Sequence, residues 1–126
     1  MRSVILVLSL VFSGLAQAGD HCAVSLDKSV HSQDVALVTR LLAKKNYTLS
    51  NSAHKVFSVV EKCALDKDDV SACEVSAKIF CLKDNEFEQN QYRMIKTSAE
   101  INFEKTSRRL LRQAIQGFKA CVDHAE

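Results

Sequence analysis

The chain has 126 residues, and 17 Lys and Arg nearly balance 15 Asp and Glu, for a formal net charge of +2. This balance argues against a function driven by a strongly basic surface, so we expect no nucleic-acid partner. The sequence contains no Pro and only three Gly. Because domains rich in strands usually need more turn residues, the composition favours helices joined by polar loops.

The first eighteen residues have the features of a secretory signal. Arg2 supplies a positive charge, residues 4–12 are apolar except for Ser9, and Ala16 and Ala18 stand where signal peptidase reads small residues. We expect residues 1–18 to be removed and residues 19–126 to form a single secreted, extracellular domain. The apolar run is shorter than the ~20 residues that a membrane-spanning helix needs, so no membrane anchor is expected.

Two helices are expected in the first part of this domain. Apolar residues at every fourth position, Cys22, Leu26 and Val30, predict a short helix over about residues 21–31. A second helix is predicted from Ser32, whose hydroxyl can cap it, to about residue 45. The polar loop that follows contains a candidate N-glycosylation site at Asn46, in the triplet Asn-Tyr-Thr.

The next two helices are predicted from apolar residues at steps of three and four. One covers about residues 53–64, and the other covers residues 71–81 and begins with a capping box formed by Ser71 and Glu74. An acidic turn over residues 66–69 separates them.

A last long segment carries a similar apolar pattern from Tyr92 to Val122, after a polar stretch over residues 84–91. Thr97 and Glu100 match a second capping box, so this segment is predicted to be either one bent helix or two helices in series. Together these segments predict an all-α fold, a small disulfide-crosslinked bundle of about five helices.

All five cysteines fall on predicted apolar stripes and are expected in the core: Cys22, Cys63, Cys73, Cys81 and Cys121. An odd number allows at most two internal bridges. If the helices over 53–64 and 71–81 run antiparallel, Cys63 meets Cys73, and Cys81 then meets Cys22 or Cys121. A bond between Cys22 and Cys121 would close the two ends, whereas crossed packing would join Cys63 to Cys81. The pairing stays open at this point.

No catalytic residues, cofactor or metal site are predicted. The four histidines are scattered and none stands at metalloprotease spacing, so the protein is not expected to be an enzyme. One weak metal candidate exists at the expected new terminus. There a free amine, two amides and the imidazole of His21 match the square-planar nitrogen set of copper(II) or nickel(II).

The candidate binding surface is a charged face near the C-terminus. It consists of Lys96, Glu100, Lys105, Arg108, Arg109 and Arg112. The alternative interpretation is an ordinary solvent-facing surface. The apolar stripes are narrow, which favours a filled core over a ligand cavity.

Two resemblances suggest partners. The run from Cys63 to Glu74, with Ala77 and Phe80-Cys81 after it, resembles insect odorant-binding proteins. This resemblance implies a carrier of a small hydrophobic ligand, although the Cys73–Cys81 spacing is one residue shorter than in that family.

The second resemblance covers the whole length. Three features resemble a salivary family of anopheline mosquitoes that includes anophensin and albicin: residues 20–22 at the mature start, residues 41–57, and a C-terminal segment ending at Cys121. It implies a salivary, haemostasis-impairing inhibitor that binds host plasma proteins. Its expected action is anticoagulant, on contact activation and kinin release, or complement evasion through the alternative pathway.

Overall fold

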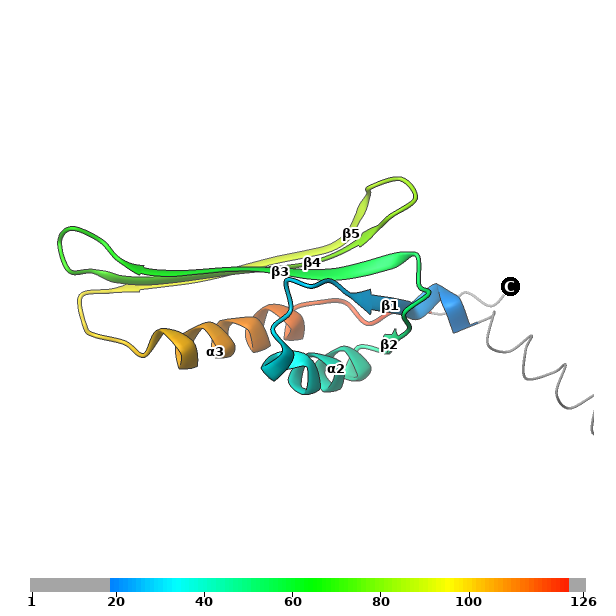
Figure 1. Ribbon diagram of the computed structural model, residues 1–126, viewed down its shortest axis with the longest axis horizontal. Coiled ribbons are helices and arrows are strands. Elements are labelled where there is room, and N and C mark those ends of the chain that lie inside the picture. The colour runs from blue at the N-terminus through cyan, green and yellow to red at the C-terminus, as the bar shows by residue number, and fades with distance from the viewer. Residues whose placement is uncertain (1–18, 123–126) are drawn as a thin grey trace, which may run out of the picture.

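The protein is a mixed five-stranded sheet with two α-helices on one face, as a computed structural model shows for residues 19–122 (Figure 1). The predicted all-α bundle is therefore wrong. The elements are η1 (Gly19–Cys22), β1 (Ala23–Leu26), η2 (Ser32–Asp34), α2 (Val35–Lys44), β2 (Thr48–Leu49), β3 (Lys55–Leu65), β4 (Ser71–Cys81), β5 (Phe87–Thr97) and α3 (Phe103–Gln116). The predicted signal peptide, residues 1–18, lies outside the described residues.

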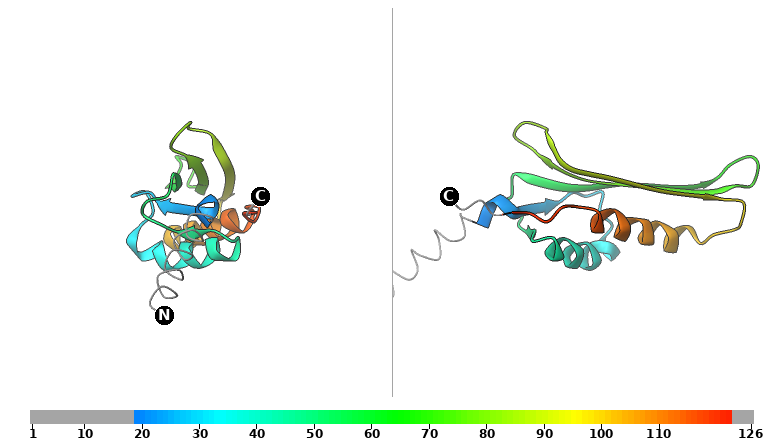
Figure 2. Two further views of the ribbon diagram at one scale, coloured as in Figure 1. Left: turned by 90° about the vertical axis from the view of Figure 1, so that its right-hand side faces the viewer. Right: turned by 180° about the vertical axis from the view of Figure 1, so that it is seen from behind.

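The sheet has the strand order β2-β1-β3-β4-β5. β1 runs parallel to both β2 and β3, whereas β3, β4 and β5 form a long antiparallel meander. α3 lies along the meander and α2 lies beside it on the same side, so no helix of residues 19–122 lies over the opposite face of β3, β4 and β5 (Figures 1 and 2). The core therefore sits in a single layer between the sheet and the helices.

β4 shows why the helix predicted over residues 71–81 is wrong. Ser71, Cys73, Val75, Ala77 and Ile79 are buried, and each residue between them is only half-buried. A period of two is the signature of a strand with one covered face. The spacing of Cys73, Ala77 and Phe80 also fits a helix, and this coincidence produced the error.

β3 replaces the helix predicted over residues 53–64 because its side chains suit a pleated surface. The run from Val56 to Val60 contains three Val and one Phe. Branching at Cβ restricts side-chain rotation in a helix and favours a strand. Phe57 is fully buried and its ring meets that of Phe118 edge-on at 6.1 Å. The helix predicted over residues 21–31 is wrong too, since only the short η1 and β1 are present there.

The C-terminal segment divides between a strand and a helix, which corrects the prediction of helix from Tyr92 onward. Residues 89–97 of β5 alternate between half-buried and exposed side chains. α3 begins only at Phe103, after the side chain of Asn102 accepts a hydrogen bond from the backbone N–H of Lys105 at 3.0 Å. Leu111 and Ile115 of α3 are fully buried against the sheet.

Asn and Asp supply the tight turns that the scarcity of Gly seemed to exclude. Asn46, Asp69 and Asn85 have φ values of 66°, 60° and 57°, in the left-handed region that Asn and Asp tolerate better than most residues. Asp69 closes the β3–β4 hairpin and Asn85 the β4–β5 hairpin. Asp66 holds the first of these turns because its Oδ1 accepts the backbone N–H groups of Asp68 and Val70, at 2.8 and 3.0 Å.

Two disulfides staple the fold. Cys22 and Cys121 join η1 to the segment after α3, across a sequence separation of 99 residues. Cys63 and Cys73 lie directly opposite one another on β3 and β4 and form the second disulfide. This is the pairing expected from an antiparallel helical hairpin, but here a hairpin of two strands forms it. Cys81, at the end of β4, is the unpaired cysteine. Such bridges are typical of oxidising compartments. No helix in residues 19–122 is long and apolar enough to cross a bilayer.

Candidate functional site

The candidate site is the outer face of α3. This helix buries Leu110, Leu111, Ala114 and Ile115 against the sheet and α2. Lys105, Arg109 and Arg112 follow one another at helical steps of four and three on the exposed side. The amphipathic pattern that attaches the helix to the sheet therefore also gathers three cations on the outside.

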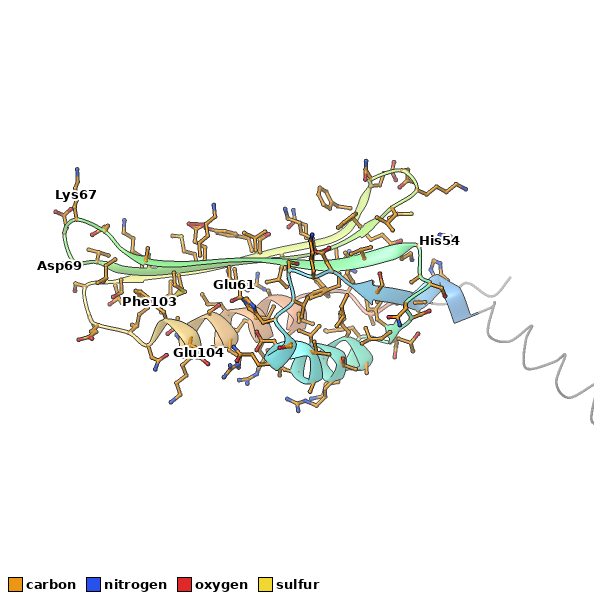
Figure 3. The ribbon with its side chains drawn as sticks, viewed as in Figure 1. His54, Glu61, Lys67, Asp69, Phe103 and Glu104 are labelled. Atoms are coloured by element: carbon orange, nitrogen blue, oxygen red, sulfur yellow. A yellow bond between two sulfur atoms is a disulfide. The ribbon has the colours of Figure 1, made fainter. Side chains whose placement is uncertain are left out.

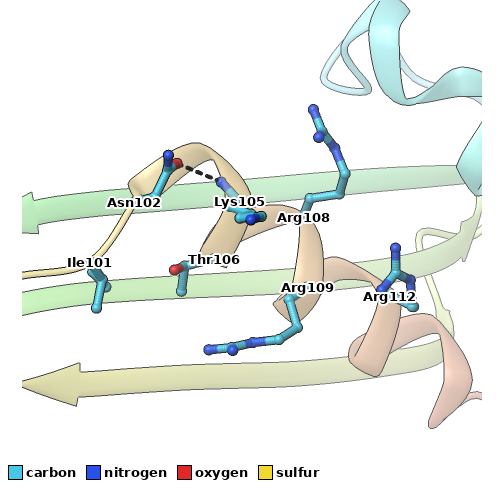
Figure 4. A pocket seen from close by; sticks show the side chains of 7 residues that line it. All are labelled: Ile101, Asn102, Lys105, Thr106, Arg108, Arg109 and Arg112. Atoms are coloured by element: carbon cyan, nitrogen blue, oxygen red, sulfur yellow. Dashed lines mark hydrogen bonds between the residues drawn. The ribbon is translucent and has the colours of Figure 1, made fainter.

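These cations line an open groove of about 600 Å³ (Figure 4). Its seven lining residues are Ile101, Asn102, Lys105, Thr106, Arg108, Arg109 and Arg112. Four of the seven are basic and none is acidic. Ile101 adds an apolar contact at the end where the β5–α3 loop enters the helix.

Arg108 differs from the other three cations because acids of the same chain partly neutralise it. Its Nε lies 3.3 Å from Oδ1 of Asp34, and its Nη2 lies 3.3 Å from Oε1 of Glu104. Asp34 is buried at the start of α2, so this pair ties α2 to α3. In residues 19–122, no carboxylate lies within ion-pair distance of Lys105, Arg109 or Arg112.

A smaller polar cleft of about 190 Å³ adjoins the groove between α3 and β3. In it the hydroxyl of Ser107 donates to Oε2 of Glu61 at 2.6 Å, and Glu104 lies on its rim (Figure 3). His31 lines the cleft, but no hydrogen bond in the described part of the chain joins it to Ser107 or Glu61. The hydrogen bond between Ser107 and Glu61 holds α3 on the sheet.

The structure brings together four of the six residues predicted as a binding surface. Lys105, Arg108, Arg109 and Arg112 share the groove. Lys96 lies exposed on β5, and Glu100 lies in the loop before α3, so neither lines it. The predicted surface is therefore narrower and more basic than the sequence suggested.

The residues that sequence reasoning missed are the acids that hold Arg108. Glu104 stands four residues before Arg108, a spacing that was legible in the sequence as a helical ion pair. The partnership of Asp34 with Arg108 joins positions 74 residues apart. No local signal reveals such a contact.

The two remaining predicted sites lie far from the groove in the chain. Asn46 is exposed and takes the left-handed turn that ends α2, with its N–H bonded to the Ala43 carbonyl, and its glycosylation stays a prediction. His21 is exposed in η1, and its carbonyl accepts a hydrogen bond from Lys55 Nζ. No cluster of three His, Cys, Asp or Glu side chains placed to hold a metal is present in residues 19–122.

Comparisons with known proteins do not assign this chain to a family. No protein-family model matches its sequence, and no curated protein matches it. It resembles a solved variant of the PelC dodecamer from Paraburkholderia phytofirmans, with TM-score 0.49 and 7% identity over 78% of this chain and 88% of that one. A second PelC dodecamer structure from the same organism aligns with TM-score 0.49 and 9% identity, over 80% of this chain and 91% of that one. A minor lipoprotein from Acinetobacter baumannii aligns with TM-score 0.39 and 17% identity, over 76% and 84%. Likeness at this level indicates neither a shared function nor a shared assembly.

Proposed function

We propose that this protein is an exported binding protein that occupies an acidic segment of a partner protein with the groove on α3. The observation that carries the proposal is the concentration of four cations in one groove that has no acid in its lining, within a chain of nearly balanced charge. Three of these cations have no carboxylate of residues 19–122 within ion-pair distance. A partner carboxylate is the group that they fit best.

The length of the cationic stripe favours a short acidic segment over a long polyanion. Lys105 and Arg112 are seven residues apart, which corresponds to ~10 Å along a helix. An extended peptide places side chains of one face about 7 Å apart, so two or three carboxylates span the stripe. Nucleic acid would require a longer basic track.

The groove is also rigid, which favours binding by occupation of a surface. α3 is packed on the sheet, Arg108 ties it to α2, and the Cys22–Cys121 disulfide fixes the segment that follows it. A surface that is ordered before binding loses less conformational entropy on association. The small hydrophobic ligand of the odorant-binding resemblance finds no comparable support, because the groove lining is mostly polar or charged.

Titration with an acidic peptide tests the proposal. The double variant Arg109→Gln/Arg112→Gln should bind a fluorescent Glu-rich peptide about tenfold more weakly than the parent protein, since two exposed ion pairs are lost. Arg40→Gln is the matched control, because Arg40 is an exposed arginine on α2 and does not line the groove. Equal affinities for all three proteins, or no binding by the parent protein at low salt, would refute the proposal.

The salivary resemblance implies a specific partner for the groove, a host plasma protein of the contact system or of complement. It predicts that the purified protein lowers kallikrein generation or C3-convertase activity when added to plasma. The Arg109→Gln/Arg112→Gln variant should lose that effect if the groove makes the contact. Unchanged activity of both cascades removes this target, while the peptide titration still decides whether the groove binds acidic segments.

A further inference from the structure

The outer edge of β5 is a second surface without a partner in the described chain. β5 pairs with β4 on one side only, and the five-stranded sheet ends there (Figure 1). The strand is eleven residues long. Long exposed edges invite pairing with another strand, and natural proteins usually shorten or cover them.

The hydrogen bonds of the sheet show which residues of β5 face this edge. The carbonyl of Phe57 accepts the backbone N–H of Asp27 at 2.9 Å, so the polar backbone groups of Phe57 point away from β4. Its opposite residue Ile79 therefore directs its own groups toward β5, where it faces Gln89. Because orientation alternates along a strand, the residues whose N–H and C=O groups face the free edge are Asn90, Tyr92, Met94 and Lys96.

The side chains of the same residues lie on the sheet face opposite α2 and α3, which no helix in the described part of the chain covers. Tyr92 and Met94 are 52% and 53% exposed, and Val60 is 48% exposed on β3. Val60 and Tyr92 share one row across the sheet, since both lie opposite Ser76 of β4. The free edge therefore carries backbone groups that pair with no strand of residues 19–122, beside the two exposed side chains of Tyr92 and Met94. The Tyr92 hydroxyl donates to Oε1 of Glu74 at 3.0 Å.

We propose that β5 pairs antiparallel with β5 of a second copy of the chain, around a two-fold axis at Tyr92. This register places Tyr92 opposite Tyr92, Asn90 opposite Met94, and Gln91 opposite Arg93. It sets no like charges against each other, whereas a register centred on Arg93 would set two guanidinium groups face to face. The result is one continuous sheet across two copies, the usual isologous arrangement of a homodimer.

The charges at the ends of the strand agree with this register. Counted along the strand, it sets Lys96 of each copy opposite Glu88 of the other, at the irregularity where β5 shifts its register against β4. Glu88 already contacts Lys55 at 2.9 Å, but its side chain is 38% exposed and is open to a second cation.

One contact within the chain must change for this pairing to form. Arg93 Nη1 donates to the Tyr92 carbonyl and to Oε1 of Gln91, both at 2.9 Å. In the dimer, the N–H of the second Tyr92 replaces the guanidinium at that carbonyl. The guanidinium of Arg93 thereby loses the Tyr92 carbonyl as an acceptor. In its place it lies opposite the side-chain amide of Gln91 of the other copy.

Charge substitutions at the edge test the register. The parent protein should dimerise with rising concentration in sedimentation velocity experiments, and Tyr92→Lys should weaken the dimer at least about tenfold because it opposes two like charges. Met94→Lys is the matched control: it adds the same charge at a site of equal exposure, but this charge faces Asn90. An equimolar mixture of Tyr92→Lys and Tyr92→Glu should restore a heterodimer. Circular dichroism shows whether each variant is folded.

Amide hydrogen exchange provides an independent readout on the parent protein. The amides of Asn90, Tyr92 and Met94 should exchange more slowly as concentration rises, whereas those of Gln91 and Ile95, already bonded to β4, should not change. A parent protein that stays monomeric up to about 1 mM, a dimer that Tyr92→Lys leaves intact, or edge amides that never gain protection would each overturn the proposal. Because β5 does not line the α3 groove, Tyr92→Lys should keep its affinity for acidic peptide, so the two proposals fail separately.

Discussion

The side chain of a single residue, Asp66, fixes the conformation of one tight turn in this fold. Asp66 organises the β3–β4 turn through two backbone N–H groups, from Val70 and Asp68. These hydrogen bonds lower the pKa of Asp66 below its ordinary value of 3.8, because they stabilise the ionised carboxylate.

The pH dependence of the hairpin follows from this lowered pKa. Ionised Asp66 stabilises the folded state at pH values above the ordinary 3.8, and the contribution is lost as the pH falls through the lower folded-state value. Asp66→Ala should therefore lower the urea midpoint at neutral pH, and the difference from the parent protein should shrink in acid. Asp68→Ala is the control, since its side chain holds no turn amide. Equal midpoints for the two variants at neutral pH would contradict the role of Asp66.

Gly117 provides a second residue-level prediction. A Cβ at this position would lie 2.6 Å from Nη2 of Arg93 and 2.9 Å from Oε1 of Gln91, while Gln91 Nε2 donates to the Gly117 carbonyl at 3.1 Å. Gly117→Ala should cost about 1 kcal/mol of unfolding free energy, the value of one hydrogen bond, since flexible side-chain ends can move aside. Combining it with Arg93→Ala should reduce that cost in thermal unfolding. Full additivity of the two changes would show that the clash is absent.

At the scale of elements, the two α-helices could be predicted from the sequence, whereas the strands could not. α2 lies within the predicted range of residues 32–45, and α3 forms the later part of the predicted C-terminal helix. Both carry apolar residues at helical steps with polar residues between them. A helix reveals itself locally because its pattern and its caps lie within one segment.

The strands were missed because their apolar spacings also fit a helix or show no alternation, although β3, β4 and β5 pair with strands next to them in the sequence. In β5, polar Gln89, Gln91 and Arg93 occupy the half-buried positions, so the alternation of hydrophobicity that reveals a strand is absent. The turns between the strands have Asp69 and Asn85 in the left-handed region instead of Gly, so the expected glycine signal for a turn was absent. The basic residues of the groove could be predicted from the sequence. The ion pair between Arg108 and Asp34 could not, because it depends on tertiary packing.

The two disulfides should differ in how much they stabilise the fold. On the loop-entropy model, the Cys22–Cys121 bridge, with its separation of 99 residues, contributes ~4.7 kcal/mol and the short Cys63–Cys73 bridge ~2.7 kcal/mol. Cys22→Ala/Cys121→Ala should therefore lower the unfolding free energy more than Cys63→Ala/Cys73→Ala does. Urea denaturation of both variants measures the order. A larger loss for the Cys63–Cys73 pair would mean that the hairpin bridge fixes structure beyond its own loop.

At the scale of the whole molecule, the sheet separates two surfaces with different chemistry. The helical side presents the basic groove of α3, and the other side exposes Val60 on β3 and Tyr92 and Met94 on the edge strand β5. No residue of β5 lines the groove, so pairing through β5 would use none of the groove's lining residues. Two grooves on one particle can hold two acidic segments together, which raises the apparent affinity for a multivalent partner without new contacts.

Chemical-shift mapping is the most direct test of the groove as the binding site. A ¹⁵N-labelled sample titrated with a Glu-rich peptide at low salt should show saturable shifts at the backbone amides of Lys105, Arg109 and Arg112, and at Ile101 beside them. The amides of Asn90 and Met94 on the β5 edge should stay in place, and added salt should reverse the shifts because the contacts are electrostatic. Shifts confined to other surfaces, or none at peptide concentrations of about 1 mM, would contradict the account.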